Sequence, residues 1–112
     1  MGVIKVVLPD DLRELLGEEA IIVEKQVLIH VLRSRLRDVL DKISEARQKI
    51  VFFERKYGMS FEEFEKNIKS GKFLEPEHHE DYVEWFFWNS VLKKMMKAKE
   101  ILLKVLKIEN SG

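Results

Sequence analysis

The chain has 112 residues, of which 46% are hydrophobic and 36% are charged. This balance is that of a globular protein, and the length allows one domain, which we place over residues 1–112. Lysine and arginine number 20, as do aspartate and glutamate, and the zero net charge argues against a protein whose whole surface binds nucleic acid. Since the chain has no cysteine, disulfides and cysteine-bound zinc are excluded.

The start of the chain and its composition indicate a cytoplasmic protein. Lys5, Pro9 and the acidic pair Asp10–Asp11 interrupt the first residues before the apolar core of a secretory signal can develop. No uncharged stretch reaches the roughly 18 residues that a membrane-spanning helix needs. Abundant lysine and glutamate with little glutamine also resemble the composition of heat-adapted proteins.

The first nine residues suggest a strand or an extended arm. Residues 3–8 are almost all β-branched or leucine, which favours a strand. A lone strand cannot satisfy its backbone hydrogen bonds, and no second strand is predicted elsewhere in the chain. We therefore expect this segment either to pair with the same strand of a second copy or to remain a loose arm. Residues 10–17 follow as a short helix that ends at Gly17.

The strongest pattern in the chain is a row of apolar residues spaced alternately three and four positions apart. It runs without a break over four heptads and predicts a helix over residues 19–57, about 58 Å long. Upstream, Ile22 keeps the phase and Lys25 interrupts it. Because so long a helix exceeds what one compact domain needs, we expect a second chain to cover its seam as the spine of a homodimer. This heptad seam comprises Ile29, Leu32, Leu36, Val39, Ile43, Ala46, Ile50, Phe53 and Tyr57.

Two more helices follow the long one. Ser60 and Glu63 form a capping box, which predicts a short helix over residues 60–70. A linker leads to a last helix over residues 77–108, whose two adjacent apolar rows predict more than one neighbour. The fold class is therefore mainly all-α, with the long helix and two further helices in an intertwined dimeric bundle, plus a short N-terminal strand.

Reaction chemistry is not indicated. The inward positions of both long helices are aliphatic or aromatic, whereas catalysis needs polar side chains that converge in a cleft. His78 and His79 are adjacent and match no zinc spacing, and no glycine-rich phosphate loop is present. We expect no catalytic residues, no cofactor and no metal site, and hence a protein that is not an enzyme.

The charges along the chain alternate by region. Basic residues dominate the positions that flank the heptad seam, whereas the charged residues of the segment 60–84 are mostly acidic. Either the acidic segment folds back on the basic flank, or the long basic side chains only shield the seam and keep their charges in water. The lysines of residues 93–107 leave a nucleic-acid-binding protein as a further alternative, although nucleic acid is not the favoured partner.

Four aromatic residues are consecutive near the start of the last helix, so they surround it. Either they pack at a junction of several helices, which is the favoured interpretation, or they contact a partner protein, since aromatic residues dominate interface hot spots. The residues that we assign to partner contact are Phe61, Trp85, Phe86 and Trp88.

Three segments together resemble the small helical antitoxins of prokaryotic toxin–antitoxin pairs. They are IKVVLPDDLRELLG (residues 4–17), EARQKIVFFERKYGMSFEEFEKNI (residues 45–68) and EDYVEWFFW (residues 80–88). The resemblance implies a protein that binds and neutralises a partner toxin and dimerises through its N-terminus. A structural coiled-coil or scaffolding dimer without a toxin is the alternative.

Overall fold

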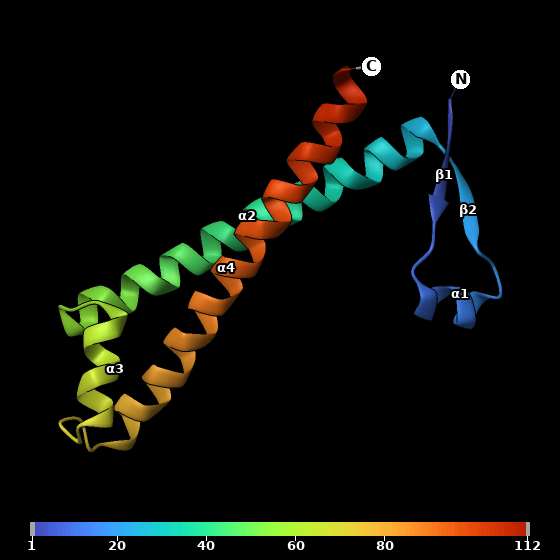
Figure 1. Ribbon diagram of the computed structural model, residues 1–112. Coiled ribbons are helices and arrows are strands. Elements are labelled where there is room, and N and C mark those ends of the chain that lie inside the picture. Colours follow the sequence, from blue (N-terminus) through green and yellow to red (C-terminus); the bar gives the residue numbers. More distant parts are fainter. Residues whose placement is uncertain (1, 112) are drawn as a thin grey trace.

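The computed structural model describes residues 2–111, and the side chains of residues 12, 16, 21 and 108–111 lie outside this description. Two parts follow one another along the chain, an N-terminal β-hairpin and a group of helices (Figure 1). The mainly helical fold with a short N-terminal strand is confirmed. The elements are β1 (Val3–Val7), α1 (Asp10–Leu16), β2 (Ala20–Glu24), α2 (Lys25–Tyr57), α3 (Phe61–Lys69) and α4 (Pro76–Ser111).

The N-terminal part is a β-hairpin whose connection contains a helix. Strand β1 pairs antiparallel with β2, with Val3 opposite Glu24 and Val7 opposite Ala20. Helix α1 fills the connection and ends at Gly17, which adopts a left-handed conformation with φ of 73° that glycine tolerates without steric cost. The hairpin extends from the start of α2, at the opposite end of α2 from α3 (Figure 1).

The prediction that no second strand exists was wrong, as was the start of the long helix at residue 19. Residues 20–24 form β2 and pair with β1 within the same chain, so β1 has a partner strand without a second copy. Helix α2 begins only at Lys25, the residue that interrupts the heptad phase, because the Glu24 carboxylate caps it by accepting a hydrogen bond from the Val27 amide (3.0 Å).

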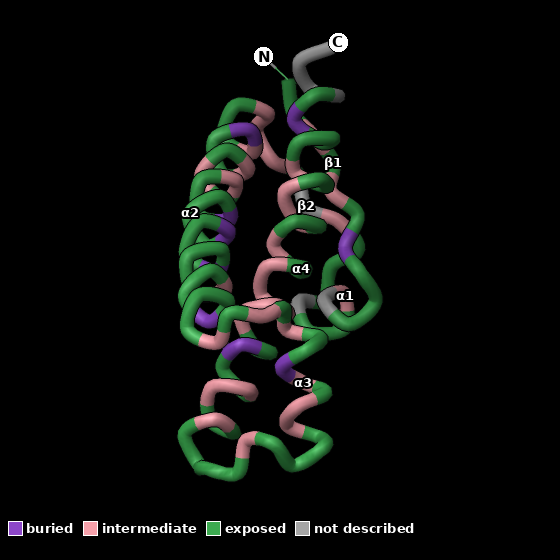
Figure 2. The backbone as a smooth tube through the Cα atoms, turned by 90° about the vertical axis from the view of Figure 1, so that its left-hand side faces the viewer, coloured by how far each residue is buried: buried purple, intermediate pink, exposed green. Residues whose placement is uncertain are grey.

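The heptad seam of α2 is covered by α4 of the same chain. The two helices run antiparallel and cross near their middles (Figure 1), and the purple buried positions of α2 in Figure 2 face α4. The expectation that a second chain must cover this seam is therefore corrected, because the long C-terminal helix supplies the opposing apolar face. The buried seam residues are Ile29, Val39, Ile43, Ala46 and Phe53, and the partly buried ones are Leu32, Leu36, Ile50 and Tyr57.

Helix α3 joins the lower ends of the two long helices. Gly58 ends α2 with φ of 63°, and the Ser60 hydroxyl accepts a hydrogen bond from the Glu63 amide (3.2 Å), as the capping box predicts. Helix α3 lies across the space between α2 and α4 (Figure 1). The turn thus brings three helices together at one end of the molecule, where the largest buried side chains gather.

Candidate functional site

The core of the three-helix junction is aromatic. Phe53 of α2, Phe64 of α3 and Trp85 of α4 are all buried and in contact. The Trp85 ring stacks on Phe64 with 5.3 Å between ring centroids and on Phe53 with 5.7 Å, and Phe61 meets it edge-on at 5.4 Å. Because each helix contributes a ring to one cluster, the cluster fixes the positions of all three helices.

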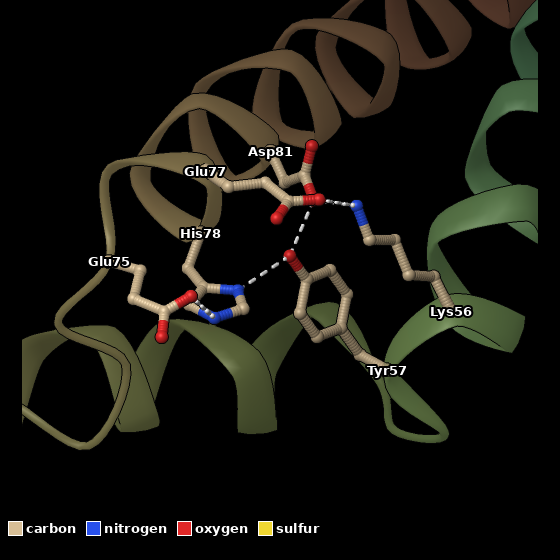
Figure 3. A network of polar contacts seen from close by, with 6 residues as sticks. All are labelled: Lys56, Tyr57, Glu75, Glu77, His78 and Asp81. Atoms are coloured by element: carbon tan, nitrogen blue, oxygen red, sulfur yellow. Dashed lines mark hydrogen bonds and ion pairs between the residues drawn. The ribbon is translucent and has the colours of Figure 1, made fainter.

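Beside this core, polar side chains join the end of α2 to the start of α4 (Figure 3). The Tyr57 hydroxyl donates a hydrogen bond to Asp81 Oδ2 (2.5 Å) and lies 3.0 Å from His78 Nδ1. The ammonium group of Lys56 pairs with Asp81 Oδ2 (2.7 Å) and with Glu77 Oε1 (2.8 Å). Since the single hydroxyl proton points to Asp81, the contact with His78 requires that His78 Nδ1 donate. We call these five residues the α2–α4 polar network.

Three groups of the network, Lys56, Tyr57 and Asp81, have shifted pKa values. Burial and then the hydrogen bond to Asp81 raise the pKa of Tyr57 above its usual value of 10.0. Hydrogen bonds to Asp81 and Glu77 likewise raise the pKa of Lys56 above 10.5. For Asp81, burial alone would raise the pKa, but the hydrogen bonds from Lys56 and Tyr57 outweigh it and lower the pKa below 3.8. None of these shifts brings a group toward the neutral range where acid–base catalysis works best, so the network fastens two helices.

The Asp81 carboxylate makes the stability of the fold depend on pH. Its lowered pKa in the folded chain means that the carboxylate stabilises the fold above pH 3.8, and that this contribution disappears as the pH falls through the lower folded pKa. We expect Asp81→Asn to lower the free energy of unfolding at neutral pH by about 1–3 kcal/mol. The loss should shrink as the pH falls toward the folded pKa. Urea unfolding followed by helical circular dichroism at several pH values measures this, with the exposed Asp41→Asn as control. Equal losses at all pH values would contradict the assignment.

The predicted partner-contact residues do not form one exposed surface. Trp85 has no exposed surface at all, so its assignment to partner contact was wrong and its place is the core. Phe61 and Trp88 are partly buried, and only Phe86 is largely exposed, at 53%. Packing at a helix junction, the alternative interpretation of these aromatics, is correct for Trp85.

Two exposed aromatic residues and the polar network were missed. Phe52 and Phe87 are 58% and 53% exposed, and each precedes a buried or partly buried aromatic neighbour. The contact of the acidic segment with the basic flank was left open between two interpretations. It occurs at Lys56, whose ammonium group pairs with Glu77 and Asp81.

The histidine pair and the lysines of α4 lie in different surroundings. His78 points to Tyr57, whereas the neighbouring His79 is exposed. Within residues 2–111, no group of three or more His, Asp or Glu side chains is arranged to hold a metal ion. No helix in this described part combines the length and the apolar character needed to cross a membrane. The exposed lysines of α4 are Lys93, Lys94, Lys97, Lys104 and Lys107, and the nucleic-acid alternative stays a prediction.

These elements define a mainly helical protein in which an antiparallel pair of long helices carries a terminal β-hairpin. The chain belongs to the family described as the Uncharacterized protein MJ0235 family, which matches residues 9–107. This is not a toxin–antitoxin family, so the resemblance to small antitoxins was misleading. Neither the curated proteins nor the solved structures yield a match.

Proposed function

We propose that this protein is a non-catalytic interaction module that works as a homodimer, in a structural or scaffolding role. The observation that carries the proposal is the large surface that a single chain leaves exposed. Because α4 covers the heptad seam, a homodimer must form through other surfaces.

The single chain is more extended than a compact protein of its size. Its accessible surface is 8548 Å², whereas a compact monomer of 13.3 kDa exposes about 6,500 Å². Its radius of gyration is 20.3 Å, against about 13 Å for a compact chain of this length. The excess surface of about 2,000 Å² exceeds the roughly 800 Å² that each partner buries in a standard protein–protein interface.

The exposed surface is also rich in large apolar side chains. Several are more than half exposed on both long helices and on the hairpin. Scattered exposed apolar residues are ordinary, but extended groups of them mark interaction sites on soluble proteins. The most exposed on the helices are Val27, Val31, Phe52, Val83, Phe86, Phe87 and Ile101, and those on the β-hairpin are Val3, Val7, Leu15 and Ile22.

The polar groups support a role without catalysis. No polar or charged residue is buried among the described residues. The α2–α4 polar network uses its charges and hydroxyl on one another, and its pKa shifts lead away from neutrality. A site of this kind offers no polar group that is free to act on a substrate.

The mass of the purified protein in solution tests the proposal. Light scattering coupled to size-exclusion chromatography, over a hundred-fold range of protein concentration, should give twice the 13.3 kDa mass of one chain at the upper end. Dissociation on dilution would give the affinity. A well-folded species with the mass of one chain at every concentration would overturn the proposal.

A further inference from the structure

We propose that two copies of the chain associate through the groove between α2 and α4, so that α2 of each copy packs against α4 of the other. This assignment rests on the proposed homodimer and names its interface. The groove is lined from α2 by Gln48, Lys49, Phe52 and Lys56, and from α4 by Asp81 and Glu84.

The groove lies on the side of the helix pair that α3 leaves open. On α4, residues 84 and 86 lie on opposite flanks of the inward-facing Trp85, since successive residues are about 100° apart around a helix. Phe61 of α3 contacts Phe86, with 6.3 Å between ring centroids, so α3 lies on that flank. Glu84 lies on the other flank, where it lines the groove together with Phe52 of α2.

Exposed apolar residues continue from the groove onto both helices. On α2, Phe52 borders a second surface hollow together with Val51 and Arg55. On α4, Glu84 borders a third together with Val83 and Phe87. The three hollows share residues, so they form one surface in which large apolar side chains surround the groove. We call this surface the open face.

The charges on the open face divide by helix. The α2 side is basic, with Lys49, Arg55 and Lys56, whereas the α4 side is acidic, with Glu80, Asp81 and Glu84. Lys56 and Asp81 pair with each other within the chain. Within the described part of the chain, no ion pair involves Arg55, Glu80 or Glu84, so these charges remain available to a partner.

This division of charge makes the open face complementary to itself, which favours a second copy of the chain as the partner and determines how it is oriented. A symmetric dimer uses the same surface on both copies, which must therefore be self-complementary. A two-fold axis parallel to the groove places the basic α2 side of one copy on the acidic α4 side of the other. An axis across the groove would instead place α2 on α2 and oppose like charges, which is unfavourable. The first arrangement also brings Phe52 of one copy toward Phe87 of the other and completes a four-helix bundle.

Charge reversal in two separate variants tests the interface. Arg55→Glu places an acidic side chain on the basic α2 side, and Glu84→Arg places a basic side chain on the acidic α4 side, so each variant brings like charges together at that position. Each variant alone should dissociate about ten-fold to a hundred-fold more readily than the wild type, because each unfavourable pair occurs twice in the dimer. An equimolar mixture of the two variants should recover the wild-type affinity, since opposite charges then face each other at both places.

Glu62→Arg is the matched control, because Glu62 is exposed on α3, away from the open face, and this variant should dimerise as the wild type does. Circular dichroism should show that all variants keep their helices. If the wild type is a dimer and both reversal variants remain dimers of unchanged affinity, the interface is wrong while the homodimer stands. If the wild type itself is monomeric at all concentrations, both proposals fail together.

Discussion

Replacing Trp85 with alanine is expected to lower the free energy of unfolding by about 3–5 kcal/mol. The ring has no exposed surface and packs on Phe53, Phe61 and Phe64. Its removal would leave a cavity at the only place where the three helices meet among the described residues. Since small domains are stable by only about 5–15 kcal/mol, the variant should retain little stability.

Urea unfolding followed by circular dichroism measures the loss, and Phe86→Ala is the matched control. Phe86 follows Trp85 in the same helix but is 53% exposed, so its replacement should cost much less. The Nε1 donor of Trp85 has no hydrogen-bond partner among the described residues. Trp85→Phe should therefore cost less than Trp85→Ala, because it removes this unsatisfied donor and keeps an aromatic ring. Equal losses for Trp85→Ala and Phe86→Ala would contradict the core assignment.

Replacing Val39 with aspartate is expected to destabilise the chain by about 3–5 kcal/mol, because it leaves a buried charge without a partner. Val39 is 1% exposed and lies near the middle of α2, the helix that packs on α4. The next residue, Leu40, is 42% exposed, so Leu40→Asp should have little effect. Val39→Ala should show a smaller loss in the same direction if the aspartate variant does not fold.

This second comparison also shows which chain covers the heptad seam. Because α4 of the same chain buries Val39, the loss of stability in the Val39 variants should not depend on protein concentration. If the seam were instead the contact between two chains, the loss would fall as the concentration rises, since association contributes to apparent stability. Unfolding curves of Val39→Ala at two protein concentrations separate these cases. A marked dependence specific to Val39→Ala would contradict the packing of α2 on α4.

Local patterns in the chain predicted the helical elements well, because the signals for a helix lie within a few residues of one another. The three-and-four spacing identified the buried side of α2 from Ile29 to Tyr57. Gly58 and Ser60 predicted the turn because a left-handed residue ends one helix and a hydroxyl caps the next. Such interactions need no knowledge of the rest of the chain.

Strand β2 could not be recognised in the same way. Residues 20–24 continue the apolar phase of the long helix through Ile22, yet they are also β-branched and suit a strand. Whether these residues form a helix or a strand depends on their pairing with β1. In the outermost pair, Val3 lies about twenty positions before Glu24 in the chain. Glu24 then caps α2, so the start of the helix depends on the same pairing.

In the candidate site, too, local patterns predicted the helix, whereas contacts between distant residues decided which side chains are buried. The consecutive aromatics from Trp85 to Trp88 must surround their helix, but the sequence does not tell which of them faces the core. The position of α3 places Trp85 inside, leaves Phe87 exposed, and brings Tyr57 to Asp81. Spacing along the chain thus specified where the long helices lie and which of their faces are apolar. The neighbour that covers each face depends on contacts between distant residues, because a face is equally apolar whether its own chain or another one buries it.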